Sequence, residues 1–507
     1  MFTKFVKIVI FSFIPALLWG FGSDVVIDTM RVVNYEWPVS YDITWRDTTD
    51  MLVGIGFNQY TSSDTSAHVR FYHSYDRGNT WTRGEEVQWP SQKISKIQLF
   101  ESPPYLIVFW QGMNNEVALT LHQRDNISAY VGSTLNAGDS VANASCFLIE
   151  NGSQKILYLV IITRNSSYDG LKIYRSFNYG AFQQIYSYNF SNSSSYIVLD
   201  DVDGTLKGDS VYLYLSLENL TRSTNSSTVS YRVFVDDLQG NVSFSAFGFQ
   251  IAYSSPLNLS TGVRGSYALS MFQADGDLNY VYLRDYFTQR GLYTFPHNNA
   301  DSSEWGPFVK GWTLDSDSGF HIIFARGNLL EGSNLYYVKA TLSEGTLHFD
   351  EPVLISDGIP VSLYNLVWFP RTSAYNPKLA TLSEVYYPAV IWPFDFWHIF
   401  YAYPWYDSTL FVVDWIEPVK INENIKGESI VFNSHTSLGT LYLNFGYEAK
   451  EEMEGAIYNV EGKLVKAFHI PMGVREFRLE LVGLGRGIYF LKLGTENVNY
   501  LRKFLVL

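Results

Sequence analysis

The sequence predicts an all-β protein built from many short strands, and three observations support this fold class. Aromatic residues make up 17% of the 507 residues, with 37 Tyr, 35 Phe and 13 Trp, and aromatic side chains favour strands. Short apolar runs recur between polar turn clusters such as Ser62–Asp64 and Asn192–Ser195. No convincing amphipathic helix of about 12 or more residues is present.

Composition excludes several classes of protein. Hydrophobic residues make up 47% of the chain, enough to bury a large core, so wholesale disorder is excluded. The 36 Lys+Arg and 50 Asp+Glu give a formal net charge of −14, which argues against a nucleic-acid partner, because nucleic-acid binding needs a basic face. Cys146 is the single cysteine, so no internal disulfide can form, and we interpret it as a small buried hydrophobic residue.

Residues 1–22 have the features of a secretory signal peptide. Lys4 and Lys7 precede the apolar run 8–19, and small residues ending at Gly22 precede a cleavage site. The alternative is an uncleaved anchor, but the run is short for a bilayer span. No later stretch is long and apolar enough to be a transmembrane segment. Loss of the two lysines changes the net charge of the mature chain to −16.

Charge divides the mature chain into two predicted domains. Residues 421–507 contain ten Lys+Arg, ten Glu and no Asp, whereas residues 23–420 hold 24 basic and 40 acidic residues. Pro418 and Gly427 are typical of a domain boundary. We therefore predict a large acidic domain at 23–420 and a small neutral domain at 421–507.

The large domain is predicted to be a β-propeller of six to eight blades, with seven favoured. A single sandwich seldom needs ~400 residues, whereas each four-stranded blade uses about 40–60 residues. Expected strands include Met51–Gly56, Val69–His73, Tyr105–Trp110, Ile156–Ile162, Val211–Leu217, Leu278–Arg284 and Thr409–Trp415.

One eight-residue segment carries a turn pattern. It reads Ser74-Tyr75-Asp76-Arg77-Gly78-Asn79-Thr80-Trp81, of the form S-x-D-x-G-x-T-W. Asp76 is expected to accept backbone N–H groups across a hairpin turn, and Gly78 to adopt a positive φ. Ser74 and Thr80 add side-chain hydrogen bonds, and Trp81 packs beneath the turn. The segment resembles the Asp-box of sialidase-like (BNR) β-propellers, which implies a structural role at the blade rim rather than a catalytic Asp76.

A degenerate copy of this segment follows. Ser176, Asn178 and Gly180 repeat the S-x-N-x-G part after a strand, without the Thr-Trp end. The alternative interpretation is an ordinary hairpin turn containing Asn and Gly. The two serines are 102 positions apart, which two blades of about 51 residues would span.

The C-terminal domain is predicted to be a small β-sandwich. Phe477, Leu479 and Leu481 alternate with charged residues, as on a strand with one buried face. Three sequence blocks then occur in order. They are I-Y-N-x-x-G-K-x-V at 457–465, L-x-x-G-I-Y-F-x-K at 484–492 and the basic-apolar terminus 502–507.

These blocks resemble the C-terminal sorting domain of the bacterial type IX secretion system (Por secretion tail). The residues that carry the resemblance are Tyr458, Asn459, Gly462, Lys463, Gly487, Tyr489, Phe490, Lys503, Phe504 and Leu507. The resemblance implies transit through the periplasm, recognition by the type IX machinery at the outer membrane, and release or attachment at the cell surface. The P-N-P start of many members is missing here, which leaves the first strand open. The alternative is a generic fibronectin-like module.

Signals of chemistry are weak in the sequence. Propeller sialidases use an arginine cluster, a Tyr–Asp/Glu pair and an acid, but no local pattern marks Arg31, Arg46 or Arg70 as a carboxylate clamp. Isolated strand arginines more often lie on solvated blade edges. Glycosidases need two facing carboxylates, and 50 acidic residues give no basis for choosing a pair. We lean against catalysis; if the protein is an enzyme, a glycoside hydrolase is expected.

Three acidic groups have calcium-loop-like spacing. They are Asp200/Asp201/Asp203, Asp275/Asp277 and Asp315/Asp317 with Gly319. None completes the calcium-binding loop pattern, so turn formation is the favoured explanation and calcium binding is the alternative; no other cofactor or metal is predicted.

An aromatic segment, 390–415, contains Trp392, Trp397 and Trp405. Their rings could stack on a sugar, although core packing is the favoured explanation. Three functions therefore stay open. The first is a secreted or surface-attached non-catalytic binder of carbohydrate or protein. The second is a sialidase-like glycoside hydrolase, and the third is a structural or adhesion component.

Overall fold

The structure is a computed structural model. It describes residues 25–31, 36–46, 49–60, 65–76, 78–89, 93–191, 195–221, 227–251, 259–274, 276–299, 302–314, 317–328, 332–356, 378–382, 385–400, 403–415, 432–437, 440–445, 452–459, 464–481, 484, 487–494 and 499–506. The predicted signal peptide lies outside these residues. Within them, every regular element is a β-strand, as the sequence predicted. The chain separates into two compact units, one spanning 21–417 and one containing 418–507.

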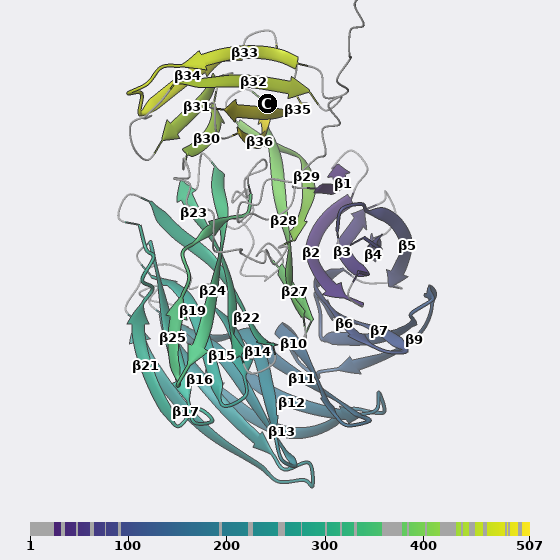
Figure 1. The fold of residues 1–507 in the computed structure, drawn as a ribbon. Helices are drawn as coiled ribbons and strands as arrows, with labels where there is room; N and C mark the ends of the chain where they lie inside the picture. Colours follow the sequence, from purple (N-terminus) through teal and green to yellow (C-terminus); the bar gives the residue numbers. More distant parts are fainter. Residues whose placement is uncertain are drawn as a thin grey trace, which may run out of the picture. The chain divides into compact units, whose positions relative to one another are not determined.

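The larger unit is a β-propeller (Figure 1). Its described residues form seven antiparallel sheets, and in six of them four consecutive strands pair in chain order. The first two of these sheets contain β2(Glu36–Trp45), β3(Met51–Tyr60), β4(Thr65–Ser74) and β5(Thr82–Trp89), and then β6(Ile94–Ser102), β7(Tyr105–Gly112), β8(Glu116–Gln123) and β9(Asn126–Asn136). The next two contain β10(Ser140–Asn151), β11(Gln154–Arg164), β12(Tyr168–Phe177) and β13(Gln183–Ser191), and then β14(Ser195–Lys207), β15(Ser210–Thr221), β16(Ser227–Asp236) and β17(Val242–Ile251). The last two contain β18(Ser260–Arg264), β19(Tyr267–Ala274), β20(Asp277–Arg284) and β21(Gln289–Thr294), and then β22(Ser303–Leu314), β23(Asp317–Asn328), β24(Gly332–Ser343) and β25(Thr346–Phe349), with β26(Val353–Leu354) also paired with β24.

The seventh sheet joins the two ends of the unit. It contains β27(Lys378–Leu382), β28(Val385–Phe400) and β29(Tyr403–Trp415), and its fourth strand is the N-terminal β1(Val25–Arg31). Strand β1 pairs antiparallel with β29, with Val25 opposite Val413. The first strands of successive sheets contact one another in the order β2, β6, β10, β14, β18, β22, β27 and then β2 again. The sheets therefore form a closed ring.

Second strands are buried on both faces, because a neighbouring sheet covers each side. All of residues 51–58 in β3 and 156–163 in β11 are buried, which explains the continuous apolar runs of the sequence. Gly54 and Gly56 allow the next sheet to approach closely, since a Cβ at either position would lie 3.1 Å from Leu99 or Ile97. Fourth strands such as β9 and β13 are mostly exposed.

Side chains of one first strand accept hydrogen bonds from the backbone of the next. Ser40 Oγ and Asp42 Oδ2 on β2 accept the N–H groups of Ile97 (3.0 Å) and Leu99 (2.8 Å) on β6. These N–H groups point away from β7, so the sheet itself gives them no acceptor.

The same arrangement recurs around the ring. Gln98 Oε1 accepts from Cys146 N (2.7 Å), and Ser260 Oγ accepts from Val309 N (3.0 Å). On β14, Asp201 Oδ2 accepts from Thr261 N (2.9 Å) and Asp203 Oδ2 from Val263 N (2.8 Å).

The prediction of a turn at Asp200–Asp203 is wrong. These residues lie inside β14, where their two-residue spacing places Asp201 and Asp203 on one face of a strand. Asp277 and Gly319 also lie in strands, β20 and β23, with Asp317 at the start of β23. Asp275 and Asp315 lie outside the described residues. Among those that are described, no three His, Cys, Asp or Glu side chains are grouped to hold a metal ion.

The smaller unit is a β-sandwich, as the sequence predicted. Its two sheets have the orders β30(Phe432–Ser437), β31(Thr440–Phe445), β34(Glu476–Glu480) and β33(Leu464–Ile470), β32(Met453–Asn459), β35(Gly487–Gly494), β36(Asn499–Val506). Leu441 and Leu443 from the first sheet pack with Ile457, Leu491 and Leu493 from the second. Each fully buried side chain of this kind contributes about 1.5–3 kcal/mol.

Replacing Asp203 tests the contacts between first strands. Asp203→Ala leaves the buried N–H of Val263 without its acceptor, so the free energy of unfolding should fall by about 1–3 kcal/mol. Asp209→Ala, in the exposed β14–β15 turn, is the matched control and should change it by no more than about 0.5 kcal/mol. Urea unfolding of the full chain measures both, and equal effects would contradict the proposed role of Asp203.

Candidate functional site

The turn between β4 and β5 is held by Asp76. Its Oδ1 accepts from Thr80 N (2.8 Å) and Ser74 Oγ (2.9 Å), and its Oδ2 accepts from Thr80 Oγ1 (2.7 Å). Gly78 has a φ of 88° and donates its N–H to Ser74 Oγ (2.7 Å). Trp81 donates from Nε1 to Gly78 O (2.9 Å) and packs against the apolar layer below the turn. All acceptor oxygens of Asp76 serve the turn, so this carboxylate fixes the hairpin.

The degenerate copy is built differently. Asn178 and Tyr179 have positive φ values of 47° and 64°, and Gly180 N donates to Phe177 O (2.9 Å). The two positive φ values and this hydrogen bond form a tight turn inside the β12–β13 connection, where strand pairing ends at Arg175 and Gln183. Ser176 Oγ donates to Gly180 O (2.7 Å), and Asn178 Oδ1 accepts from Lys155 N (2.9 Å) in a different hairpin.

A turn that the sequence analysis missed resembles the Asp76 turn more closely. Between β16 and β17, Asp237 Oδ1 accepts from the N–H groups of Gln239 and Asn241 (both 2.9 Å), and Oδ2 accepts from Asn241 Nδ2 (2.6 Å). Gly240 has a φ of 120°. This turn could have been found from the sequence, because in both turns a residue with a side-chain donor follows the Asp by four positions. That residue is Thr80 after Asp76 and Asn241 after Asp237.

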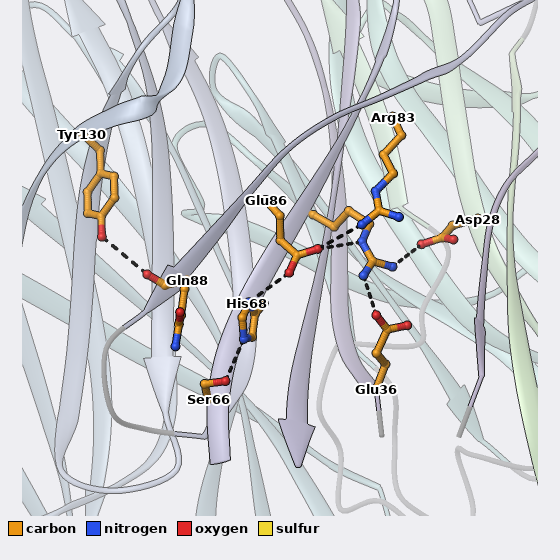
Figure 2. A network of polar contacts seen from close by, with 9 residues as sticks. Asp28, Glu36, Ser66, His68, Arg83, Glu86, Gln88 and Tyr130 are labelled. Atoms are coloured by element: carbon orange, nitrogen blue, oxygen red, sulfur yellow. Dashed lines mark hydrogen bonds and ion pairs between the residues drawn. The ribbon is translucent and has the colours of Figure 1, made fainter. Parts of the chain in front are cut away.

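A charged cluster lies around Arg70 on β4, and Figure 2 shows its acidic members Asp28, Glu36 and Glu86. Its guanidinium donates from Nη1 to Asp28 Oδ2 (3.1 Å), from Nη2 to Glu36 Oε1 (2.6 Å) and from Nε to Glu86 Oε2 (3.0 Å). The guanidinium also lies 4.8 Å from the ring centroid of Phe57. The Arg70 side chain is 5% exposed. Burial lowers the pKa of Arg70, but the hydrogen bond to Glu36 and the charges of Asp28 and Glu36 outweigh this effect, so the pKa is raised.

Glu86 joins this cluster to a histidine. His68 Nδ1 lies 3.1 Å from Glu86 Oε1, and His68 Nε2 lies 2.7 Å from Ser66 Oγ. Arg83 Nη2 donates to Glu86 Oε2 (3.3 Å) from an exposed position. The hydrogen bond from His68 lowers the pKa of Glu86; burial opposes this and Arg70 adds to it, giving a pKa of about 2. Glu86 is therefore ionised at neutral pH.

The cluster bridges two sheets at the point of ring closure. Asp28 comes from β1, whereas Glu36, Arg70 and Glu86 come from β2, β4 and β5. Because β1 belongs to the sheet of β27–β29, Arg70 fixes the closing strand to the neighbouring sheet.

A second buried cluster contains Arg46 and Arg124. Each arginine donates from Nη2 to the backbone carbonyl of the other, at 2.6 and 2.7 Å. Both approach Glu101, with Arg124 Nε 3.1 Å and Arg46 Nε 3.9 Å from its carboxylate. Arg46 Nη1 also lies 3.5 Å from His73 Nδ1. Burial, followed by the charge of Arg46, lowers the pKa of His73.

These contacts correct the solvated position that we expected for strand arginines. The side chains of Arg46 and Arg70 are only 6% and 5% exposed, and both are engaged by protein groups. The side chain of Arg31 is outside the described residues. Sequence could not identify the partners, because Arg70 and Asp28 are 42 positions apart.

Three further arginines are each paired with a carboxylate that is fully buried, although the side chain of Arg164 is itself 34% exposed. The pairs are Arg164 with Asp169 (2.9 Å), Arg175 with Asp236 (2.6 Å) and Arg326 with Glu304 (2.7 Å).

The predicted stacking tryptophans lie on two paired strands. Trp392 and Trp397 are in β28 and Trp405 is in β29, where His398 is opposite Trp405 and Trp397 is opposite Tyr406. Their side chains are outside the described residues. Cys146 is buried, and burial raises the pKa of its thiol to about 12.

In the sandwich, the three blocks of the sorting motif meet on adjacent strands. Tyr458 of β32 is opposite Phe490 of β35, and Asn459 is opposite Tyr489. Phe490 is in turn opposite Lys503 of β36, and Tyr489 is opposite Phe504. Gly487 starts β35 opposite Val506. Gly462, Lys463 and Leu507 lie outside the described residues.

Comparison with protein families identifies the tail. Residues 437–507 match the family described as the secretion system C-terminal sorting domain. The protein is therefore exported through the type IX secretion system to the cell surface or the extracellular space. No helix among the described residues is long and apolar enough to cross a membrane.

Comparisons with whole proteins give only distant similarities. No curated protein matches the chain. A mutant of AofleA from Arthrobotrys oligospora is 12% identical, with 66% of this chain and 90% of that chain covered and a TM-score of 0.38. The α-L-arabinofuranosidase Arb93A from Fusarium graminearum, in complex with an iminosugar inhibitor, is 12% identical, with 66% and 98% covered and a TM-score of 0.39. The complex of the same organism's GH93 α-L-arabinofuranosidase with arabinobiose is 10% identical, with 77% and 97% covered and a TM-score of 0.37. At these scores the matches carry no argument about activity.

Replacing in turn the two arginines that bind Glu86 tests the contribution of the Arg70 cluster to stability. Arg70→Met leaves Asp28, Glu36 and Glu86 without their shared cation, so the free energy of unfolding should fall by about 3–5 kcal/mol. Arg83→Met removes the exposed partner of the same Glu86 and should cost no more than about 1 kcal/mol. Denaturant unfolding of both variants measures the difference. Similar losses of unfolding free energy in the two variants would show that the stability provided by these ion pairs does not depend on their burial.

Proposed function

We propose that this protein is a secreted or surface-attached β-propeller that binds an extracellular carbohydrate or protein without catalysing a reaction. The observation that carries the proposal is the internal pairing of the buried ionic clusters described above. Arg46, Arg70, Arg175 and Arg326 all donate to groups of the protein itself. Such clusters make a rigid scaffold, but they leave these arginines unable to hold a substrate.

The sialidase-like hydrolase is the weaker alternative. Tyr158, Asp236 and Arg175 combine the residue types that such a mechanism needs, with Tyr158 Oη donating to Asp236 Oδ2 (2.8 Å). However, Tyr158 and Asp236 are both 0% exposed, so a substrate cannot reach them. Burial, followed by the charge of Asp236, raises the pKa of Tyr158, which keeps its hydroxyl protonated and poorly nucleophilic.

We also propose the domain limits 1–22 for a cleaved signal peptide, 23–420 for the propeller and 421–507 for the sorting domain. The division into compact units between residues 417 and 418 supports the second boundary. The pairing of β1 with β29 supports a propeller that uses nearly the whole span, since both strands belong to one sheet.

Deleting residues 421–507 tests the export route. The shortened chain should accumulate in the periplasm, with at least a tenfold lower amount in the medium or on the cell surface, as measured by fractionation and immunoblotting. Protease resistance of the periplasmic material controls for folding of the propeller. Unchanged delivery of the shortened chain to the medium would contradict the role of the tail.

Parallel binding and turnover measurements on the purified full chain test the proposed function. We expect binding to at least one member of a panel of extracellular glycans and envelope proteins, with no release of sugar from sialosides, arabinans or other polysaccharides above the blank. Turnover that is lost in a folded variant of an accessible carboxylate would favour the hydrolase. Absence of both binding and turnover would favour a structural or adhesion component.

A further inference from the structure

Arg232 on β16 differs from the buried arginines described above. Its Nε atom is buried and makes no hydrogen bond, as is also the case for Arg46 and Arg175. The difference is that, within the described part of the chain, no carboxylate approaches the guanidinium of Arg232. By contrast, Arg175 in the preceding sheet binds Asp236 through both carboxylate oxygens. An arginine that is half-buried without an anion is costly for the folded state, because its charge is partly removed from water without compensation.

Two aromatic rings lie against this guanidinium. Its Cζ atom lies 4.6 Å from the ring centroid of Phe190 and 5.2 Å from that of Tyr188, both on β13. On β17, Phe244 packs against Tyr186 with centroids 5.5 Å apart. Figure 1 shows β13 in one sheet and β16 and β17 in the next. Arg232 therefore lies where the outer strands of two neighbouring sheets meet.

The surface around Arg232 is partly exposed to solvent. Tyr188 is 44% exposed and Phe244 is 49% exposed, although both are large hydrophobic residues. Burial lowers the pKa of Arg232, while the nearby hydroxyl groups of Tyr186 and Tyr188 oppose this effect. Arginine nevertheless stays charged at neutral pH. The surface thus combines a cation that has no carboxylate partner with aromatic faces that are exposed to solvent.

A planar carboxylate fits the guanidinium best, because two parallel N–H donors match its two oxygens. A sugar ring fits the aromatic faces, which can pack against its C–H groups. The net charge of −14 opposes a highly charged polyanion but not a ligand with a single carboxylate.

We propose that Arg232, with Tyr186 and Tyr188, binds the carboxylate of a uronic-acid-type sugar unit whose ring covers Tyr188. This inference rests on the proposed binding function and names the ligand class of one site. A peptide carboxylate would satisfy the arginine but would not cover the rings, so we favour the sugar.

Ligand-observed NMR titrations of the full chain test this site with glucuronate, glucose and pentaglutamate as probes. We expect glucuronate to bind at least tenfold more tightly than glucose and pentaglutamate. Arg232→Met should weaken glucuronate binding at least tenfold, and Tyr188→Ala should weaken it as well. Arg83→Met, which removes an exposed arginine from another sheet, is the matched control and should leave binding unchanged.

Stability provides a second readout. Arg232→Met breaks no ion pair, so its unfolding midpoint should equal or exceed that of the unmodified chain. A loss similar to that of Arg70→Met would give Arg232 a structural role and overturn the proposal. Equal binding of glucose and glucuronate, or tighter binding of pentaglutamate, would also overturn it. If the chain binds other glycans but not glucuronate, this proposal fails and the proposed function stands; if it binds no glycan or protein, both fail.

Discussion

The propeller depends on capping the open edge of each first strand. A first strand pairs with the second strand of its own sheet, so every other N–H group on its free edge needs another acceptor. In the described residues, Ser, Asp or Gln side chains of the preceding first strand supply it on β6, β10, β18 and β22, as from Ser40 and Asp42 to Ile97 and Leu99. Each of these sheets is therefore positioned by hydrogen bonds from its neighbour as well as by apolar packing. The two-residue spacing of donors and acceptors also fixes the register between sheets.

This constraint explains part of the acidic composition of the large domain. Asp42, Asp201 and Asp203 accept backbone N–H groups, whereas Asp236 and Glu304 neutralise buried arginines. Neither role requires a ligand. These five acidic residues thus serve the scaffold, whereas Arg232 has no such carboxylate partner among the described residues.

The sequence predicted the fold class because its signals are local. Alternating and continuous apolar runs report strands, and the Asp76 turn is encoded within eight residues. The role of Asp201 and Asp203 was not predictable from spacing, because acidic residues two positions apart suit a metal loop, a turn and one face of a strand equally well. The Arg70 cluster was not predictable either, since its carboxylates come from three different strands. In the tail, by contrast, the sorting motif could be found from sequence because its three blocks keep their order and distances.

The pairing of β1 with β29 has a consequence for the order of folding. Val25 meets Val413, 388 positions later in the chain, so the ring stays open until nearly the whole propeller has been synthesised. Contacts between such distant segments form slowly, and the open sheet edges are prone to aggregation until they form. The sorting domain follows β29 in the chain. A chain that carries the complete tail therefore already contains every strand that the ring needs in order to close.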